Sequence, residues 1–206
     1  MTHFDDKATT WDDDPDHVKR AKIIARRLKL ALGNEAIETA MEYGSGTGQL
    51  SFELKNDLPR ITLMDESVNM TKVAKQKCND LEVDNLYPIK YDLLLNPLFF
   101  ERYDLIYTML TLHHIENIQM ILQKFKQLMN PGGLLILIDL EKEDGSFHDY
   151  DFDGHLGFEQ NELEEKLHHI GFNPKHYEVC YTINKEKENG QLRSYPLFMM
   201  VSKKEP

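Results

Sequence analysis

A glycine-rich turn at residues 42–50, EYGSGTGQL, most constrains what this chain can fold into. Gly44, Gly46 and Gly48 lie between an apolar run and an amphipathic stretch, which predicts a strand, a tight turn and a helix in that order. Glycines in such a turn can adopt positive φ angles and let a ligand approach the backbone closely. The free N–H groups at the start of the next helix favour an anion or a carboxylate.

The spacing of these glycines differs from the G-x-G-x-x-G fingerprint of dinucleotide-binding proteins. The sixth position counted from Gly44 is Gln49, whereas the fingerprint requires glycine there. The observed pattern is E-x-G-x-G-x-G, beginning at Glu42. Taken alone, the turn is also typical of a plain connection between a strand and a helix, so the rest of the chain must decide its role.

Short apolar runs alternate with amphipathic stretches along the chain, which favours βαβ units around a mostly parallel sheet. The predicted helices cover residues 16–32, 49–56, 67–79, 118–128 and 162–170. The predicted strands cover residues 36–43, 60–64, 86–91, 103–108, 134–140, 177–184 and 195–202. The polar link 185–190 predicts that the last two strands form an antiparallel hairpin.

Sequence signals at the helix ends refine these boundaries. Ser67 is the predicted cap of the third helix, and the NPGG segment at 130–133 is predicted to end the fourth. Asn161 is the predicted N-cap of the last helix, with Glu164 completing a capping box.

Composition limits the class of protein and its partners. The 206 residues are 41% apolar and 29% charged, which is typical of a soluble globular domain. The net charge of −11 argues against a nucleic-acid partner. Cys78 and Cys180 form no metal-binding or disulfide pattern, the start of the chain does not resemble a signal peptide, and the longest apolar run, 134–138, is too short to cross a bilayer. We therefore expect a cytoplasmic protein without a membrane partner.

Two aspartates indicate what the glycine-rich turn holds. Asp65 ends the second predicted strand, where a carboxylate can accept hydrogen bonds from both hydroxyls of a ribose. That role suits a nicotinamide cofactor and an adenosyl cofactor equally. Asp92 ends the third strand, where a carboxylate can accept from the exocyclic amine of adenine. An aspartate after a strand is also a common turn cap.

These features together resemble the class I S-adenosylmethionine-dependent methyltransferases. The resemblance rests on the E-x-G-x-G-x-G turn, Asp65 within TLMDES, Asp92, and the NPGG segment before the fifth strand. It implies a Rossmann-like, doubly wound α/β fold with seven strands in the order 3-2-1-4-5-7-6 and an antiparallel C-terminal hairpin. The N-terminal segment FDDKATTWD resembles the opening of a bacterial branch of small-molecule type. We expect one domain over residues 1–206, in which a helical cap (1–33) precedes the core (35–206).

The resemblance implies roles for the residues of the glycine-rich turn. Gly44, Ser45, Gly46 and Gly48 would line the methionine end of S-adenosylmethionine. Glu42 would lie near the ammonium group of the cofactor.

The residues that follow the next strands would hold the adenosyl half. Asp65 would bind the ribose, and Glu66 and Met70 would border the adenine. Asp92 would bind the adenine amine, with the backbone of Leu93 beside it.

The end of the fourth strand and the loop after it would form the reacting part of the site. Thr108 and Met109 would border the sulfonium. His113 and His114 follow, and a histidine there can remove a proton from an OH, NH or SH nucleophile. His155 is a third candidate catalytic residue, in a GHLGF segment. The alternative for each histidine is a hydrogen bond to the backbone or simple packing.

The sequence predicts no metal site. Residues 149–154, DYDFDG, resemble the start of a calcium loop, but position 12 is Gln160 rather than a glutamate and no helix precedes the segment. The metal-dependent branch of the family uses carboxylates after strand four, where this chain has histidines. Asp139 alone does not supply that site.

We therefore expect methyl transfer to a small molecule by in-line displacement. The attacked atom stays open among O, N, S and C, as does the oligomeric state. Three alternatives stay open: a non-catalytic module that binds S-adenosylmethionine, a protein methyltransferase and a nicotinamide oxidoreductase. Two acidic segments, 5–16 and 141–153, are expected either to be solvated loops or to close over the site, and in the second case to favour a neutral or cationic acceptor.

Overall fold

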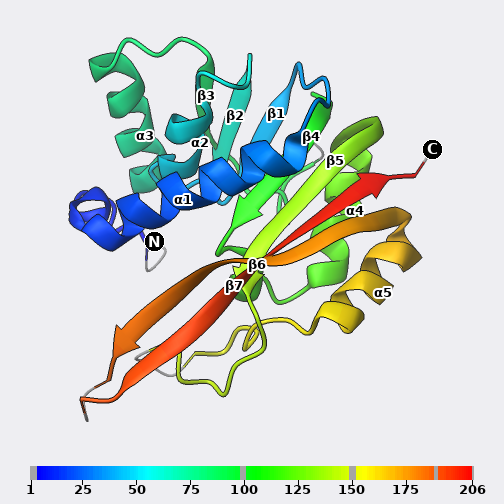
Figure 1. The fold of residues 1–206 in the computed structure, drawn as a ribbon. Helices are drawn as coiled ribbons and strands as arrows, with labels where there is room; N and C mark the ends of the chain where they lie inside the picture. The colour runs from blue at the N-terminus through cyan, green and yellow to red at the C-terminus, as the bar shows by residue number, and fades with distance from the viewer. Residues whose placement is uncertain (1–3, 98–100, 149–151, 188–189, 206) are drawn as a thin grey trace.

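The computed structural model describes residues 4–97, 101–148, 152–187 and 190–205. Its described part contains a seven-stranded sheet in the order β3-β2-β1-β4-β5-β7-β6, as the resemblance implied (Figure 1). The strands are β1 (Ala40–Tyr43), β2 (Ile61–Asp65), β3 (Leu86–Lys90), β4 (Tyr103–Met109), β5 (Met129–Leu140), β6 (Phe172–Glu186) and β7 (Leu192–Lys204). The first five strands are parallel, and β7 pairs antiparallel with both β5 and β6.

Five α-helices connect or cover these strands. They are α1 (Pro15–Leu32), α2 (Gln49–Leu54), α3 (Val68–Asp80), α4 (Ile118–Leu128) and α5 (Gln160–Ile170). Two 3-10 turns, η1 (Trp11–Asp13) and η2 (Leu112–His114), lie before α1 and after β4. Local chemistry sets the helix starts: the side chain of Asp14 accepts from the Asp16 N–H, and Ser67 caps α3 through the Met70 N–H, as predicted.

The helices cover the two faces of the sheet as separate layers, visible in Figure 1. One core joins α1, α2 and α3 to strand residues such as Ala40, Leu63 and Leu105. The other joins α4 and α5 to the neighbouring strand residues, such as Met41 and Ile106. Because successive side chains of a strand point to opposite faces, a sheet buried on both sides has continuously apolar strands. This explains the unbroken apolar run in β5.

The C-terminal hairpin is longer than the sequence predicted. Its strands were expected at 177–184 and 195–202, but β6 and β7 extend beyond both ranges. The predicted link at 185–190 was therefore too long, since Lys185 and Glu186 still pair with Arg193 and Leu192. The far end of the hairpin projects past the other strands (Figure 1).

Three further boundaries were wrong. The first strand begins at Ala40, not at residue 36. The NPGG segment follows the end of α4 as predicted, but it is part of β5, because Met129 pairs with Tyr103. Asn161 is not the N-cap of α5; Glu159 occupies that position without a side-chain bond. Phe158 forms a bridge with Glu141, and the chain enters the helix directly after it.

None of the helices in the described parts of the chain combines the length and apolar character that crossing a bilayer requires.

Gly48 tests how far the tight turn depends on glycine. Its φ is +80°, and an added Cβ would lie 2.5 Å from Cδ2 of Leu63. We expect Gly48→Ala to lower the free energy of unfolding by about 3 kcal/mol, through backbone strain and overpacking. Gly190 is the matched control, because its φ is +73° and nothing lies within 4 Å. Gly190→Ala should cost about 1 kcal/mol in urea denaturation, and equal losses in the two variants would contradict the packing argument.

Candidate active site

A cavity of about 790 Å³ lies at the carboxyl ends of β1, β2 and β4. These ends meet at one edge because the three strands are parallel and in register, with Tyr43 opposite Met64 and Glu42 opposite Tyr107. An open parallel sheet binds ligands at this edge. The volume is within the range typical of small-molecule and cofactor sites.

The glycine-rich turn forms one wall of the cavity. Gly44 and Gly46 both have positive φ, at +69° and +54°. An added Cβ at Gly44 would collide with the side chain of Thr111, which follows β4. At Gly46 the nearest described atom would be Sδ of Met70, at 3.9 Å. Gly44 thus permits close packing of the β4 loop, while Gly46 leaves space for a ligand beside the backbone.

Asp65 connects this turn to the end of β2. Its Oδ2 accepts from the Gly46 N–H at 2.7 Å, and its Oδ1 accepts from the Ser67 N–H at 2.8 Å. Burial raises the pKa of Asp65, while the two backbone N–H bonds oppose that effect. Each carboxylate oxygen can accept a further hydrogen bond, so Asp65 can still bind a pair of hydroxyl groups in the cavity.

Glu42 is a buried acid at the inner wall of the cavity. Its Oε2 accepts from both the N–H and the hydroxyl of Ser51, and that hydroxyl lies 2.6 Å from the hydroxyl of Tyr107. Burial raises the pKa of Glu42 to about 8. The carboxyl group therefore holds its proton at neutral pH unless a positive group binds next to it.

The N-terminal segment, residues 4–14, lines the cavity through residues such as Phe4 and Trp11. It also bonds the glycine-rich turn after β1 and the turn after β2. Oδ1 of Asp12 accepts from Thr47 at 2.5 Å and from Gln49 at 2.8 Å, while its Oδ2 pairs with Lys77 at 2.6 Å. Oδ1 of Asp5 accepts from the hydroxyl of Ser67 at 2.6 Å. The sequence left open whether this acidic segment is a solvated loop or closes over the site; in the structure the carboxylates of Asp5 and Asp12 bind the protein itself.

Arg20 on α1 also lines the cavity. Its side chain is buried, and within the described residues its Nε has no hydrogen-bond partner. Burial lowers the pKa of Arg20. A buried guanidinium whose Nε has no hydrogen-bond partner among the described residues is costly, so this position favours an anionic group on a bound ligand.

The loop after β4 presents two histidines to the cavity. His113 is buried against Asp139 of β5: its Nδ1 lies 2.6 Å from Oδ1, and its backbone N–H donates to Oδ2 at 3.3 Å. Oδ1 also accepts from the Leu140 N–H. The carboxylate accepts a hydrogen bond from the Nδ1–H, so Nε2 is the nitrogen of His113 that does not contact Asp139.

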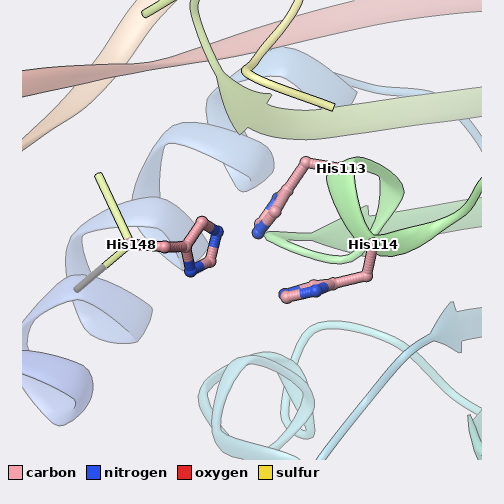
Figure 2. A group of neighbouring side chains, drawn as sticks. All are labelled: His113, His114 and His148. Atoms are coloured by element: carbon pink, nitrogen blue, oxygen red, sulfur yellow. The ribbon is translucent and has the colours of Figure 1, made fainter. Parts of the chain in front are cut away.

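A third histidine, His148, joins these two from the loop after β5. Figure 2 shows the three rings, each presenting a nitrogen toward the space between them. The ring centroid of His148 lies 5.4 Å from that of His113 and 5.6 Å from that of His114. Their ligand atoms all lie within 4.8 Å of one another.

The structure brings most of the predicted site residues to this one cavity. Those that line it are Glu42, Gly44, Ser45, Gly46, Asp65, Glu66, Met70, Met109, His113 and His114. Those that do not line it are Gly48, Asp92, Leu93, Thr108 and His155.

Each of the outlying residues has a structural reason for its place. Gly48 packs under Leu63, and Thr108 points to the buried face of β4. Asp92 caps its own turn, since Oδ1 accepts from the Leu94 and Leu95 N–H groups, which is the turn role considered above.

Leu93 and His155 hold neighbouring segments together. Leu93 is fully buried, and its carbonyl accepts from Lys124. Nε2 of His155 lies 2.9 Å from the carbonyl of Ile115. The backbone N–H of His155 donates to the carbonyl of His113. His155 thus fastens the outside of the histidine loop and lines a second cavity beside α4.

Several residues that line the cavity were not predicted from the sequence, among them Leu110, Arg20 and His148. Leu110 has a φ of +54°, a strained value for leucine that turns the chain sharply after β4. Arg20 and His148 come from α1 and from the loop after β5. Neither forms a motif, and only the tertiary fold brings them to the glycine-rich turn.

The sequence matches a protein family over most of its length. The family described as a methyltransferase domain covers residues 16–185. The chain belongs to the class I S-adenosylmethionine-dependent methyltransferases. As a member of this class, the chain is a methyltransferase domain of the S-adenosylmethionine-dependent type.

Individual relatives agree with this assignment. The chain is 27% identical over 142 residues to an uncharacterized methyltransferase of Schizosaccharomyces pombe, covering 66% of this chain and 48% of that protein. It is 26% identical over 126 residues to a demethylmenaquinone methyltransferase of Oceanobacillus iheyensis, covering 60% of this chain and 51% of that protein. The chain thus spans about half the length of each relative.

A solved structure shows the same fold. The N-methyltransferase NodS of Bradyrhizobium japonicum, in complex with S-adenosyl-L-homocysteine, has a TM-score of 0.68 to this methyltransferase. The match covers 94% of this chain and 89% of NodS at 16% identity, so it shows the shared fold.

The residues in the cavity fit S-adenosylmethionine. The open space at Gly46 admits a ligand against the backbone, and Asp65 offers a carboxylate to hydroxyl groups. The buried carboxyl group of Glu42 suits an ammonium, and the buried guanidinium of Arg20 suits a carboxylate. S-adenosylmethionine carries all three of these: ribose hydroxyls, an ammonium and a carboxylate.

Glu42 should make the stability of the empty enzyme depend on pH. Below about pH 4.5 the acid is protonated in both the folded and unfolded chains, and between 4.5 and about 8 only the unfolded chain loses the proton. The free energy of unfolding should therefore fall by about 5 kcal/mol over this range. Glu42→Gln should remove that fall. Urea denaturation at several pH values measures it, with the exposed Glu38→Gln as control; parallel curves for Glu42→Gln and the wild type would contradict the assignment.

Proposed function

We propose that this enzyme methylates a small molecule that binds in the same cavity as the cofactor. The observation that supports this most directly is the cover over the cavity. Phe4 and Trp11 of the N-terminal segment, Phe147 of the loop after β5, and Lys185 of the hairpin all line it. A cavity covered from three directions suits a small acceptor better than a folded protein or a nucleic acid.

The donor would occupy the side of the cavity nearest the glycine-rich turn. Gly44, Ser45 and Gly46 would bind its methionine end, with the carboxyl group of Glu42 near the ammonium. The ammonium of the donor would favour loss of the Glu42 proton, because a positive charge beside the buried carboxylate stabilises its ionised form.

The adenosyl half would extend toward the end of β2. Asp65 would accept from the ribose hydroxyls, while Glu66 and Met70 would border the adenine. Asp92 would reach the adenine amine only through its second oxygen, because Oδ1 is used by the turn. The backbone of Leu93 would lie beside Asp92 at the adenine amine. Met109 would border the reacting sulfur, because Met109 lines the cavity and Thr108 does not.

The protein's contribution to the reaction would be orientation and exclusion of water. S-adenosylmethionine supplies a methyl group on a sulfonium, which is already a good leaving group. The chain would hold the acceptor atom in line with that methyl group and keep water out with Phe4, Trp11 and Phe147. His113 and His114 would contact the acceptor, because they line the cavity beyond the glycine-rich turn.

The charge of the acceptor is less restricted than the acidic sequence suggested. Asp12 and Asp5 bind the glycine-rich turn and Ser67, and Asp144 pairs with Arg193 at 2.6 Å. Of the charged side chains that do line the cavity, Lys7 and Asp14 belong to the N-terminal segment, and Lys185 belongs to the hairpin. Because Asp5, Asp12 and Asp144 are bound to the protein, they give no reason to exclude an anionic acceptor.

A labelled methyl group tests this function. The enzyme is incubated with S-adenosylmethionine labelled on the methyl carbon, together with a cell extract separated into small molecules and macromolecules. We expect label to enter the small-molecule fraction. Label that enters only proteins would favour a protein methyltransferase, and binding of S-adenosylhomocysteine without any transfer would favour a regulatory module.

Arg20 provides a test of how the donor lies in the cavity. We expect Arg20→Met to weaken binding of S-adenosylhomocysteine by about 10- to 100-fold, because a charge-assisted hydrogen bond to the ligand carboxylate is lost. Binding of 5′-methylthioadenosine, which has no carboxylate, should not change. Calorimetric titration measures both ligands, with the exposed Arg26→Met as control. Equal losses for the two ligands would show that Arg20 does not bind the donor carboxylate.

A further inference from the structure

Three histidines from two separate loops converge in the cavity. His113 and His114 lie on η2 after β4, and His148 lies 34 residues later, after β5. Their ligand nitrogens all lie within 4.8 Å of one another, and all three residues line the cavity. Figure 2 shows a nitrogen of each ring directed at a common point.

The geometry is close to that of three imidazoles around one metal ion. Nitrogens bound to a tetrahedral zinc ion lie about 3.3 Å apart, which follows from bonds of about 2.05 Å, and the ring centroids then lie roughly 5 Å apart. The centroids of His148 and its two neighbours are 5.4 and 5.6 Å apart. Those of His113 and His114 are closer, at 4.1 Å. Side-chain rotations that move the nitrogens by about an ångström would complete the site.

Asp139 orients His113 as a metal ligand requires. The carboxylate holds Nδ1 at 2.6 Å and is itself fully buried. A carboxylate on one nitrogen of a histidine fixes the ring and increases the basicity of the other nitrogen, a common arrangement behind bound metals. Nε2 of His113 is the nitrogen left to face the cluster.

The loop that carries His148 is held in place by its neighbours. The N–H of Phe147 donates to Glu143 at 3.0 Å, and the carbonyl of Phe147 accepts from Lys185 at 2.7 Å. The hydroxyl of Tyr195 donates to the carbonyl of Ser146 at 2.9 Å. These contacts anchor the residues next to His148 on the C-terminal hairpin, so its approach to the other two histidines is built into the fold.

Aromatic side chains surround the cluster. Phe152 stacks on His148 with ring centroids 3.7 Å apart, and Phe4 meets His114 edge-on at 5.2 Å. Phe147 lies 6.3 Å from His113. An apolar shell of this kind limits access of water and strengthens the bonds between a metal ion and its ligands.

We propose that His113, His114 and His148 bind one divalent transition-metal ion of the zinc type. Neutral imidazole nitrogens suit zinc and its neighbours, whereas calcium and magnesium prefer oxygen. Three protein ligands leave a fourth position open, as in catalytic zinc sites. The sequence predicted no metal because His148 forms no motif with the other two, and only carboxylate ligands were considered.

The open position would take the methyl acceptor, which extends the function proposed above and rests on it. A metal ion lowers the pKa of a bound OH or SH group, so the acceptor would lose its proton to water on binding. The anionic oxygen or sulfur would then form a bond to the methyl carbon as the bond from that carbon to the sulfonium breaks. The electron pair stays on the departing thioether sulfur. The inference thus restricts the acceptor to compounds with an ionisable OH or SH group.

Cobalt provides a direct test of the site. The purified full-length enzyme is treated with a chelator, dialysed and titrated with CoCl₂ while the visible absorption of four-coordinate cobalt is followed. We expect one Co²⁺ per chain, displaced by ZnCl₂. His148→Ala and His114→Ala should each weaken binding by about 100-fold or more, since a direct ligand is worth at least as much as the groups behind it. Asp139→Asn should weaken binding by about 10- to 100-fold.

The controls separate this inference from the proposed function. His168 is exposed on α5, and His168→Ala should bind cobalt as the wild type does. S-adenosylhomocysteine binding in the same samples verifies the fold and the donor site. Two results would overturn the metal site while leaving the donor site intact, provided that S-adenosylhomocysteine still binds. One is the absence of cobalt absorption bands, and the other is cobalt binding by His148→Ala as tight as that of the wild type. Methyl transfer that survives complete removal of metal would overturn its role with the acceptor and favour His113 as a general base.

Discussion

The carboxylate of Asp65 joins the two turns on which the cavity depends. Its oxygens accept from the N–H groups of Gly46 and Ser67, so the glycine-rich turn after β1 and the turn after β2 share one acceptor. The N-terminal segment then adds Asp12 and Asp5 to the same two turns. The parallel register of β1 and β2 places the turns side by side, and the carboxylate keeps them there. The donor site is thus mostly preformed backbone rather than flexible side chain.

The strand order and the meeting of the glycine-rich turn with Asp65 could be predicted because local patterns and the family resemblance indicate them. Alternating apolar and amphipathic segments indicated a parallel sheet, and the comparison with the family supplied the order that the structure confirms. Gly46 and Asp65 lie at strand ends, so their convergence follows from parallel strands alone. Errors in this part concern boundaries. Phe158 pairs with Glu141, and that tertiary contact overrides the local preference for Asn161 as a cap.

The acceptor side could not be predicted, because it depends on contacts between distant segments. His148 lies beside His113 because its neighbour Phe147 is held by backbone hydrogen bonds to Glu143 and Lys185, which no local pattern signals. The same limitation hid Asp139, which appears in the sequence as one residue of an apolar strand and in the structure as the partner of His113. His155 was predicted as a third candidate catalytic residue, with a hydrogen bond to the backbone as the alternative. In the structure its Nε2 lies 2.9 Å from the carbonyl of Ile115, which is that alternative.

The glycine-rich turn and the three histidines line one cavity, and we propose that the methyl donor and the acceptor meet in it. A crystal structure of the enzyme with S-adenosylhomocysteine tests it most directly. We predict that the ribose hydroxyls contact Asp65 and that the thioether sulfur faces His113, His114 and His148 across the space left for the acceptor. A sulfur directed away from the histidines, or a ligand bound away from Gly46, would contradict the account.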